Sequence, residues 1–222
     1  MTASASLTRI ARGVLIAATV PLAGCASSTF TSGTAPTEVA GDNQLAASPS
    51  NIASLSDVVQ RNPNDPQALN MRGTVYGQSG RNQEALADFN KAIGIRPDNA
   101  QAYYNRGLLY QSQKQHQYAI DDFSTAIGLT QNQAEPYIAR GLSYMAVNDF
   151  KAAAGDLDDA VSVEPQNLQA WTTRAYAYEK LGDKEKAAGS YARALNLNKD
   201  HEAAKQGFAR VGGKMGQSYQ TF

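Results

Sequence analysis

Residues 100–133 have the sequence AQAYYNRGLLYQSQKQHQYAIDDFSTAIGLTQNQ, and the distinctive positions of this stretch return every 34 residues along the chain. Arg106 and Gly107 have counterparts one period earlier and one period later. The full series are Arg72, Arg106, Arg140 and Arg174, followed by Gly73, Gly107, Gly141 and Ala175. A fixed period of this length indicates a stack of one supersecondary unit, in which each copy buries its apolar face against the next.

Each copy contains two helical patterns separated by a short break. Tyr103, Gly107 and Tyr110 fall on one face of a first helix, at spacings of four and three. Ala119 and Phe123 occupy equivalent places on a second helix after the break. Glycine inside a helix costs about 0.5–1 kcal/mol relative to alanine, so its return at one phase indicates a close approach of two helices. The repeat therefore predicts antiparallel helix pairs.

The period and several key residues resemble those of the tetratricopeptide repeat family. Its pattern of an aromatic residue, Gly, Tyr, Ala-x₃-Phe and a closing Pro is similar to Tyr103, Gly107, Tyr110, Ala119–Phe123 and the prolines Pro97 and Pro165. The resemblance implies an all-α, right-handed α-solenoid over residues 51–211. Its expected parts are a half repeat at 51–65, repeats at 66–99, 100–133, 134–167 and 168–201, and a capping helix at 202–211.

The first 25 residues have a pattern typical of exported lipoproteins. Arg9 and Arg12 precede a short apolar run at 13–20, which is too short to span a membrane and predicts a signal peptide over residues 1–24. The run ends in Leu-Ala-Gly-Cys at Cys25, the only cysteine. An ordinary cleavage site with an incidental cysteine is the alternative. The four residues resemble the bacterial lipobox, which implies palmitate and diacylglycerol on Cys25.

Low-complexity segments flank the repeats. Residues 25–50 are rich in Ser, Thr, Ala, Gly and Pro and predict a flexible tether, and residues 212–222 predict a flexible tail. Ala26 follows the cysteine, where some lipoproteins of Gram-negative bacteria have an aspartate that retains them in the inner membrane. By this resemblance we expect a lipid anchor in the outer membrane of the cell envelope, with the chain facing the periplasm.

Composition and motifs argue against catalysis and against nucleic acid. The chain has 20 basic and 20 acidic residues, which does not favour a broad charged surface for nucleic acid or anionic lipid. His116 and His201 are the only histidines, and neither has a metal-ligand spacing. No serine lies three residues before a lysine, so a Ser-x-x-Lys nucleophile is excluded. We therefore predict a protein that is not an enzyme and needs no cofactor or metal.

The repeated arginines allow two interpretations. They form a basic ladder for an anionic ligand, or they pair with aspartates sixteen residues later on the facing helix. We favour structural ion pairs, because each arginine lies beside the packing glycine. The predicted pairs are Arg72–Asp88, Arg106–Asp122 and Arg140–Asp156. Arg174 has Ser190 at the corresponding position and needs another partner.

In the family that the repeats resemble, the first helix of each copy lines a concave groove that holds a peptide or partner segment. The residues of this chain at the matching positions form a surface of apolar side chains with some amides and hydroxyls. The predicted groove consists of Asn70, Met71, Thr74, Tyr104, Asn105, Leu108, Ile138, Leu142, Met145, Thr172, Thr173 and Tyr176.

Together, these features predict a non-catalytic scaffold that binds envelope proteins or peptide segments and contacts the membrane through its lipid alone. It is similar in this respect to the NlpI-type tetratricopeptide lipoproteins. A pilotin-like assembly factor for pilus or secretin subunits is the alternative, and a cell-wall-acting enzyme is the weakest one. A homodimer is compatible with each of these.

Overall fold

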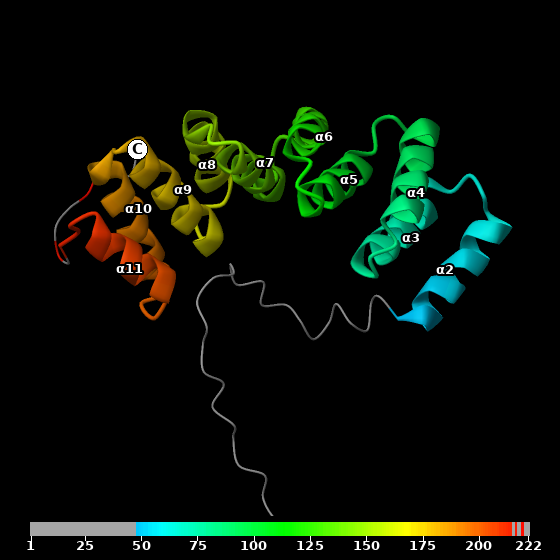
Figure 1. Ribbon diagram of the computed structural model, residues 1–222, viewed down its shortest axis with the longest axis horizontal. Helices are drawn as coiled ribbons and strands as arrows, with labels where there is room; N and C mark the ends of the chain where they lie inside the picture. Colours follow the sequence, from blue (N-terminus) through cyan, green and yellow to red (C-terminus); the bar gives the residue numbers. More distant parts are fainter. Residues whose placement is uncertain (1–47, 215, 217–218, 220–222) are drawn as a thin grey trace, which may run out of the picture. The chain divides into compact units, whose positions relative to one another are not determined.

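Ten α-helices and no strands make up the part of the chain that the computed structural model describes, residues 48–214 with 216 and 219 (Figure 1). All of these residues lie in one unit of the chain, Val39–Phe222. The predicted signal peptide, Cys25 and most of the tether lie outside the described residues. The helices are α2 (Pro49–Arg61), α3 (Pro66–Gln78), α4 (Asn82–Ile95), α5 (Ala100–Ser112), α6 (His116–Leu129), α7 (Ala134–Ala146), α8 (Phe150–Val163), α9 (Leu168–Leu181), α10 (Lys184–Leu197) and α11 (Glu202–Arg210).

The helices pack as consecutive pairs, which confirms the predicted all-α solenoid. The tightest neighbours are α3 with α4, α5 with α6, α7 with α8, and α9 with α10. Each second helix also contacts the first helix of the next pair, and the first helices α3, α5, α7 and α9 contact one another in turn. These first helices therefore form a continuous layer. Helix α2 packs on α3 at one end, and α11 packs on α9 and α10 at the other.

The turn inside each pair depends on one residue in the left-handed conformation. Gly80 and Gly182 have φ of 77° and 79° at this position, and Lys114 and Asn148 have 60° and 64°. Glycine adopts this conformation without strain, whereas lysine does so at some cost. The recurrence at one phase, even with a lysine, shows that helix pairing requires this turn.

Close packing explains the repeated glycines. A Cβ atom on Gly73 would lie 2.9 Å from the ring of Phe89, and one on Gly107 would lie 2.7 Å from the ring of Phe123. The fourth pair has Ala175 instead of glycine, and there the ring of Tyr191 lies against Gly207 of α11. The predicted role of these positions in close helix approach is thus confirmed.

The C-terminal end is covered by its own chain. Tyr219, which lies in the predicted flexible tail, packs edge-on against Phe208 of α11 with 5.8 Å between ring centroids. Its hydroxyl accepts a hydrogen bond from the Lys214 backbone N–H at 2.6 Å. Phe208 is 6% exposed, so this contact helps to cover an apolar side chain of the last helix. None of the described helices is long and apolar enough to span a bilayer.

Candidate functional site

A first cavity opens between α3 and α5, and we call it the N-terminal cavity. It has a volume of about 220 Å³ and is lined mainly by apolar atoms. Three of the predicted groove residues, Thr74, Asn105 and Leu108, meet there. The complete lining is Thr74, Gly77, Gln78, Phe89, Asn105, Leu108, Leu109 and Ser112.

A second cavity, the C-terminal cavity, opens between α7, α9 and α11. It has a volume of about 290 Å³ and brings together five of the predicted groove residues, Leu142, Met145, Thr172, Thr173 and Tyr176. Tyr191 and three residues of α11 complete its wall, namely Ala203, Gln206 and Arg210. The sequence analysis did not include these four, because it took the groove from the first helices alone and treated α11 only as a cap.

Amide and hydroxyl groups link α3 to α5 beside the N-terminal cavity. The Asn105 side-chain amide donates to Asn70 Oδ1 at 3.1 Å and to Thr74 Oγ1 at 3.2 Å. Gln101 in turn donates to Asn105 Oδ1 at 2.9 Å. The Thr74 hydroxyl donates to the Asn70 backbone carbonyl at 2.9 Å. Met71 of α3 lies outside these cavities and is 56% exposed. The amides are therefore held in fixed positions next to exposed apolar side chains.

Two predicted groove residues are buried: Asn70, which is 9% exposed and hydrogen-bonded to Asn105, and Ile138, for which the prediction is wrong. Ile138 is only 5% exposed and belongs to the hydrophobic core formed by α7 and the helices that follow it. Its phase matches that of Tyr104, but its aliphatic side chain is buried in the core that also contains Leu157 and Trp171. Ile138 therefore supports the fold and offers no surface to a partner.

A third cavity, the acidic cavity, lies where α5, α7 and the end of α8 meet. It has a volume of about 330 Å³ and is lined by Gln101, Tyr104, Gln133, Glu135, Pro136 and Glu164. The Tyr104 ring packs against Phe123 with 5.8 Å between centroids. Burial and the nearby Glu135 carboxylate raise the pKa of the Tyr104 hydroxyl above its ordinary value, so it stays protonated.

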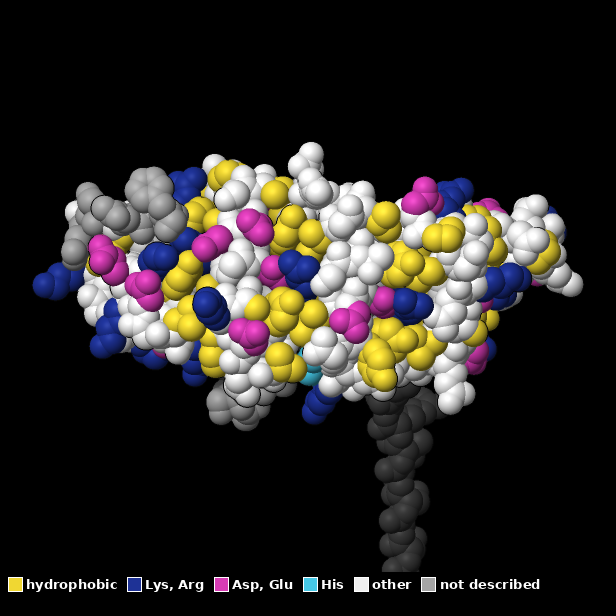
Figure 2. All heavy atoms as spheres, turned by 90° about the horizontal axis from the view of Figure 1, so that it is seen from above, with side chains coloured by type: hydrophobic (Ala, Val, Ile, Leu, Met, Phe, Trp, Pro, Cys, Tyr) yellow, Lys and Arg dark blue, Asp and Glu magenta, His cyan; other side chains and the backbone are white. Residues whose placement is uncertain are grey.

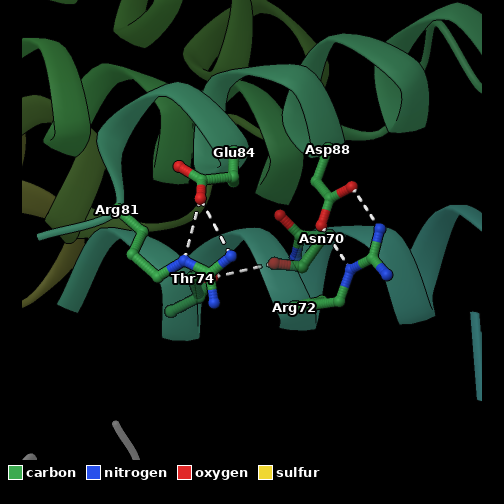
Figure 3. A network of polar contacts seen from close by, with 6 residues as sticks. All are labelled: Asn70, Arg72, Thr74, Arg81, Glu84 and Asp88. Atoms are coloured by element: carbon green, nitrogen blue, oxygen red, sulfur yellow. Dashed lines mark hydrogen bonds and ion pairs between the residues drawn. The ribbon is translucent and has the colours of Figure 1, made fainter. Parts of the chain in front are cut away.

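The repeated arginines lie against aspartates, as Figure 3 shows for Arg72 and Asp88. Arg72 Nε donates to Asp88 Oδ2 and Nη2 to Oδ1, both at 2.7 Å. The same two-pronged contact joins Arg106 to Asp122 and Arg140 to Asp156, at 2.7–2.8 Å. None of these arginines lines one of the three cavities, so the arrangement supports pairing rather than an anionic-ligand ladder.

Burial limits what such a pair contributes to stability. Burial raises the pKa of the Asp156 carboxyl, although Arg140 opposes this by stabilising its charge. Desolvation of two charges offsets much of their attraction, so an ion pair of this kind contributes little net free energy. Its effect on orientation is clearer. Arg140 Nη1 also donates to Ser124 of the preceding second helix at 2.9 Å, and Arg106 Nη1 to Asn90 at 2.5 Å. Arg106 and Arg140 thereby each link two successive pairs.

Arg174 finds its carboxylate in the preceding pair. It is 1% exposed, and its Nε donates to Asp158 Oδ1 of α8 at 2.5 Å while Nη1 donates to Ser190 Oγ at 2.7 Å. Tyr178 also donates to Asp158, at 2.7 Å. Burial and this hydrogen bond to a carboxylate raise the pKa of Tyr178 to about 12. Asp158 is therefore the sole carboxylate that neutralises this buried guanidinium among the described residues.

On the face drawn in Figure 2, acidic, basic and apolar side chains are interspersed. The described residues contain no group of three or more His, Cys, Asp or Glu side chains arranged to bind a metal ion. The cavities that lie along the layer of first helices are the two apolar cavities and the acidic cavity. Two further cavities lie at the loops around Asn62–Asp65 and Pro165–Asn167 and contain none of the predicted groove residues.

Comparison with known proteins agrees with this architecture. Residues 73–114 match a family model described as TPR repeat, and residues 100–132 and 138–206 match two described as tetratricopeptide repeat. No curated protein matches the sequence significantly.

Several solved structures share the fold. A crystal structure of MamA is 25% identical, with a TM-score of 0.63 over 68% of this chain and 88% of that one. MamA from Desulfovibrio magneticus RS-1, residue 41 to the end, is 20% identical, with a TM-score of 0.63 over 73% and 89% of the two chains. YrrB, described as a TPR protein with an unusual peptide-binding site, is 18% identical, with a TM-score of 0.64 over 71% and 81%.

Proposed function

From the tetratricopeptide repeats that the chain contains, we propose that it is a non-catalytic adaptor that binds segments of other proteins along its layer of first helices. Proteins built from such repeats generally mediate protein–protein interactions. The observation that carries the proposal is the pair of apolar cavities between adjacent first helices, each with amides or hydroxyls at its edge.

The size of the cavities favours a protein segment over a small molecule. Small-molecule sites usually have about 300–1,000 Å³ and enclose most of the ligand. The two cavities, of about 220 and 290 Å³, are smaller and open, which suits single apolar side chains of a longer segment. Leu108 and Tyr176 lie at the cavities and are 37% and 39% exposed. The Asn105 amide uses both of its N–H donors on Asn70 and Thr74, and its Oδ1, which accepts once from Gln101, has a second lone pair that suits a peptide N–H of such a segment.

We further propose that the partners are envelope proteins and that Cys25 carries the lipid that holds the chain at the outer membrane. The lipobox-like residues before Cys25 support this assignment. The composition of residues 25–50 predicts a flexible tether, and about 25 residues of such a chain have a root-mean-square reach of roughly 25–30 Å. That length allows the repeats to bind periplasmic partners away from the membrane surface.

Replacing both Leu108 and Tyr176 with alanine is expected to abolish capture of envelope partners. Each side chain belongs to a different cavity, and truncating an interface anchor typically costs about 2 kcal/mol or more. The measurement is capture by the full chain from a detergent extract of the envelope, with the retained proteins identified by mass spectrometry. Because these two anchors are apolar, the loss of capture caused by the double substitution is expected to be about the same at low and at physiological salt.

The matched control replaces Tyr118 and Leu129 of α6, which are 61% and 40% exposed and line neither cavity. This variant also removes one aromatic and one leucine side chain, and it is expected to retain capture. Equal capture by both double variants would place the binding surface elsewhere.

Cys25→Ser is expected to prevent lipid attachment and release the protein into the soluble periplasmic fraction. In the proposed modification the lipid is attached to the sulfur of Cys25, and serine has no sulfur. Stable anchoring requires more than one acyl chain, as a fully modified lipoprotein cysteine provides. Metabolic labelling with a fatty-acid analogue followed by membrane fractionation measures both effects. Wild-type protein that takes up no label contradicts the anchor.

A further inference from the structure

We propose that the segment bound by this chain carries a lysine or arginine side chain that enters the acidic cavity between the second and third helix pairs. This inference rests on the proposed adaptor function and specifies the chemistry of its ligand. The acidic cavity is lined by residues of α5 and α7, the same first helices whose next turns line the N-terminal and C-terminal cavities. A segment that follows this layer therefore passes both kinds of site.

The lining of the acidic cavity is suited to a cation. It contains the carboxylates of Glu135 and Glu164 and the hydroxyl of Tyr104, with no basic side chain among its lining residues. The Glu164 carboxylate accepts one hydrogen bond from the Asn167 amide at 2.9 Å. Glu135 forms no ion pair or hydrogen bond with the residues that the structure describes and is exposed. Its negative charge is thus available to an external partner.

The aromatic wall of the cavity is a second, independent feature. A cation over an aromatic ring is attracted by the negative face of the ring. Many tyrosines of this chain already have a basic side chain near the ring, at 4.3–5.9 Å from the centroid: Tyr76, Tyr103, Tyr110, Tyr144, Tyr176 and Tyr178. Within the described residues Tyr104 has no such neighbour, and its ring is fixed against Phe123 beside Glu135.

The charge of the third helix pair points the same way. Residues 134–167 contain six acidic and two basic residues. Arg140 is paired with Asp156, and Asp158 with Arg174. Among the described residues the other four acidic side chains, Glu135, Asp149, Asp159 and Glu164, form no ion pair, and Lys151 is the one remaining base of this segment. Such a local field attracts a cationic group during encounter and disfavours an acidic one. Apolar anchors thus supply affinity, and the basic side chain fixes the position of the segment.

The test starts from a random displayed peptide library selected on the full chain. We expect the selected peptides to share one basic position with apolar residues near it. Synthetic peptides with and without that charge, Lys replaced by Met, are then titrated against the wild type and Glu135→Gln by fluorescence anisotropy. Removing either charge is expected to weaken binding roughly five-fold, as for a half-exposed ion pair next to an aromatic ring. Removing both is expected to weaken binding little further, because the two charges contact each other.

Glu185→Gln is the matched control. Glu185 is the second residue of α10 as Glu135 is of α7, so both substitutions remove the same favourable charge from a helix N-terminus. Glu185 lines none of the three cavities, and its replacement is expected to leave peptide affinity unchanged.

The outcomes separate this inference from the adaptor function. Selected peptides that lack a basic position but lose affinity in the Leu108→Ala/Tyr176→Ala variant would overturn the basic-residue inference and leave the adaptor function standing. A loss of affinity on replacing Lys with Met that is equal for the wild type and for Glu135→Gln would likewise overturn the basic-residue inference and leave the adaptor function standing. Failure to select any peptide, or peptides indifferent to Leu108 and Tyr176, would overturn the adaptor function and this inference with it.

Discussion

Asp158→Ala is expected to lower the free energy of unfolding by about 3 kcal/mol, a loss measured by denaturant titration. The substitution leaves the Arg174 guanidinium, which is 1% exposed, without a carboxylate. Removing one partner of a buried ion pair typically costs about 3–5 kcal/mol, because the other charge stays buried and uncompensated. Asp158 itself is partly exposed, which places the expected loss at the lower end of that range. Tyr178 also loses the acceptor for its hydroxyl.

Two variants make this expectation specific. Asp159→Ala removes an adjacent, exposed carboxylate that is not paired with Arg174, and it is expected to change stability by less than about 0.5 kcal/mol. Ser190→Asp, placed in the Asp158→Ala background, restores the aspartate that the first three pairs have sixteen residues after the arginine. It is expected to recover part of the lost stability. An Asp158→Ala protein as stable as the wild type would show that Arg174 is solvated or paired differently.

The partner of Arg174 illustrates which contacts the sequence predicts. The pairs Arg72–Asp88, Arg106–Asp122 and Arg140–Asp156 follow from their common spacing of sixteen residues. Ser190 interrupts that spacing, so the spacing rule gives Arg174 no partner. The missing signal was a second period: residues sixteen positions before the arginine, Asn90, Ser124 and Asp158, all accept from it. In the fourth pair the acidic residue occupies this earlier position.

The outline of the candidate site was predictable, because the position of a residue within the repeat determines on which side of the first helix its side chain lies. Thr74, Asn105 and Leu108 meet in one cavity, and Leu142, Met145 and Tyr176 meet in another. Depth was not predictable from phase. Ile138 and Tyr104 share a phase, yet the first is core and the second lines a cavity, since side-chain size and neighbours decide burial.

The role of α11 was missed for a related reason. Its amphipathic pattern predicts a capping helix, and it does cap α10. Tyr191 of the fourth pair lies against Gly207 of α11, and this pair has Ala175 in place of the glycine of the other pairs. Arg210 then reaches Glu179 of α9 at 2.8 Å and closes the C-terminal cavity. Such contacts involve positions that depart from the repeat, so the repeat pattern does not predict them.

Trp171→Ala is expected to lower the free energy of unfolding by about 3–5 kcal/mol, the usual cost of truncating a large core side chain to alanine. Trp171 is 6% exposed and belongs to the core that α7 to α11 share. Its indole N–H donates to the Pro165 backbone carbonyl at 2.9 Å, which ties α9 to the loop that ends the third pair. Its ring also lies 5.4 Å from the Arg174 guanidinium. The substitution therefore weakens both the core and the junction between the last two pairs.

Because Trp171 is the only tryptophan, unfolding of the variant is followed by far-ultraviolet circular dichroism rather than by fluorescence. Trp171→Phe keeps most of the apolar surface and loses the hydrogen bond, so it is expected to cost less than the alanine variant, about 1–2 kcal/mol. In a stack of repeats each unit depends on its neighbours, so the damage is expected to appear first in α9 to α11, as faster amide hydrogen exchange there than in α3 to α6. Uniform exchange across all helices would mean that the repeats unfold as one cooperative unit and that the junction has no separate stability. An unchanged denaturation midpoint would show that Trp171 is not buried.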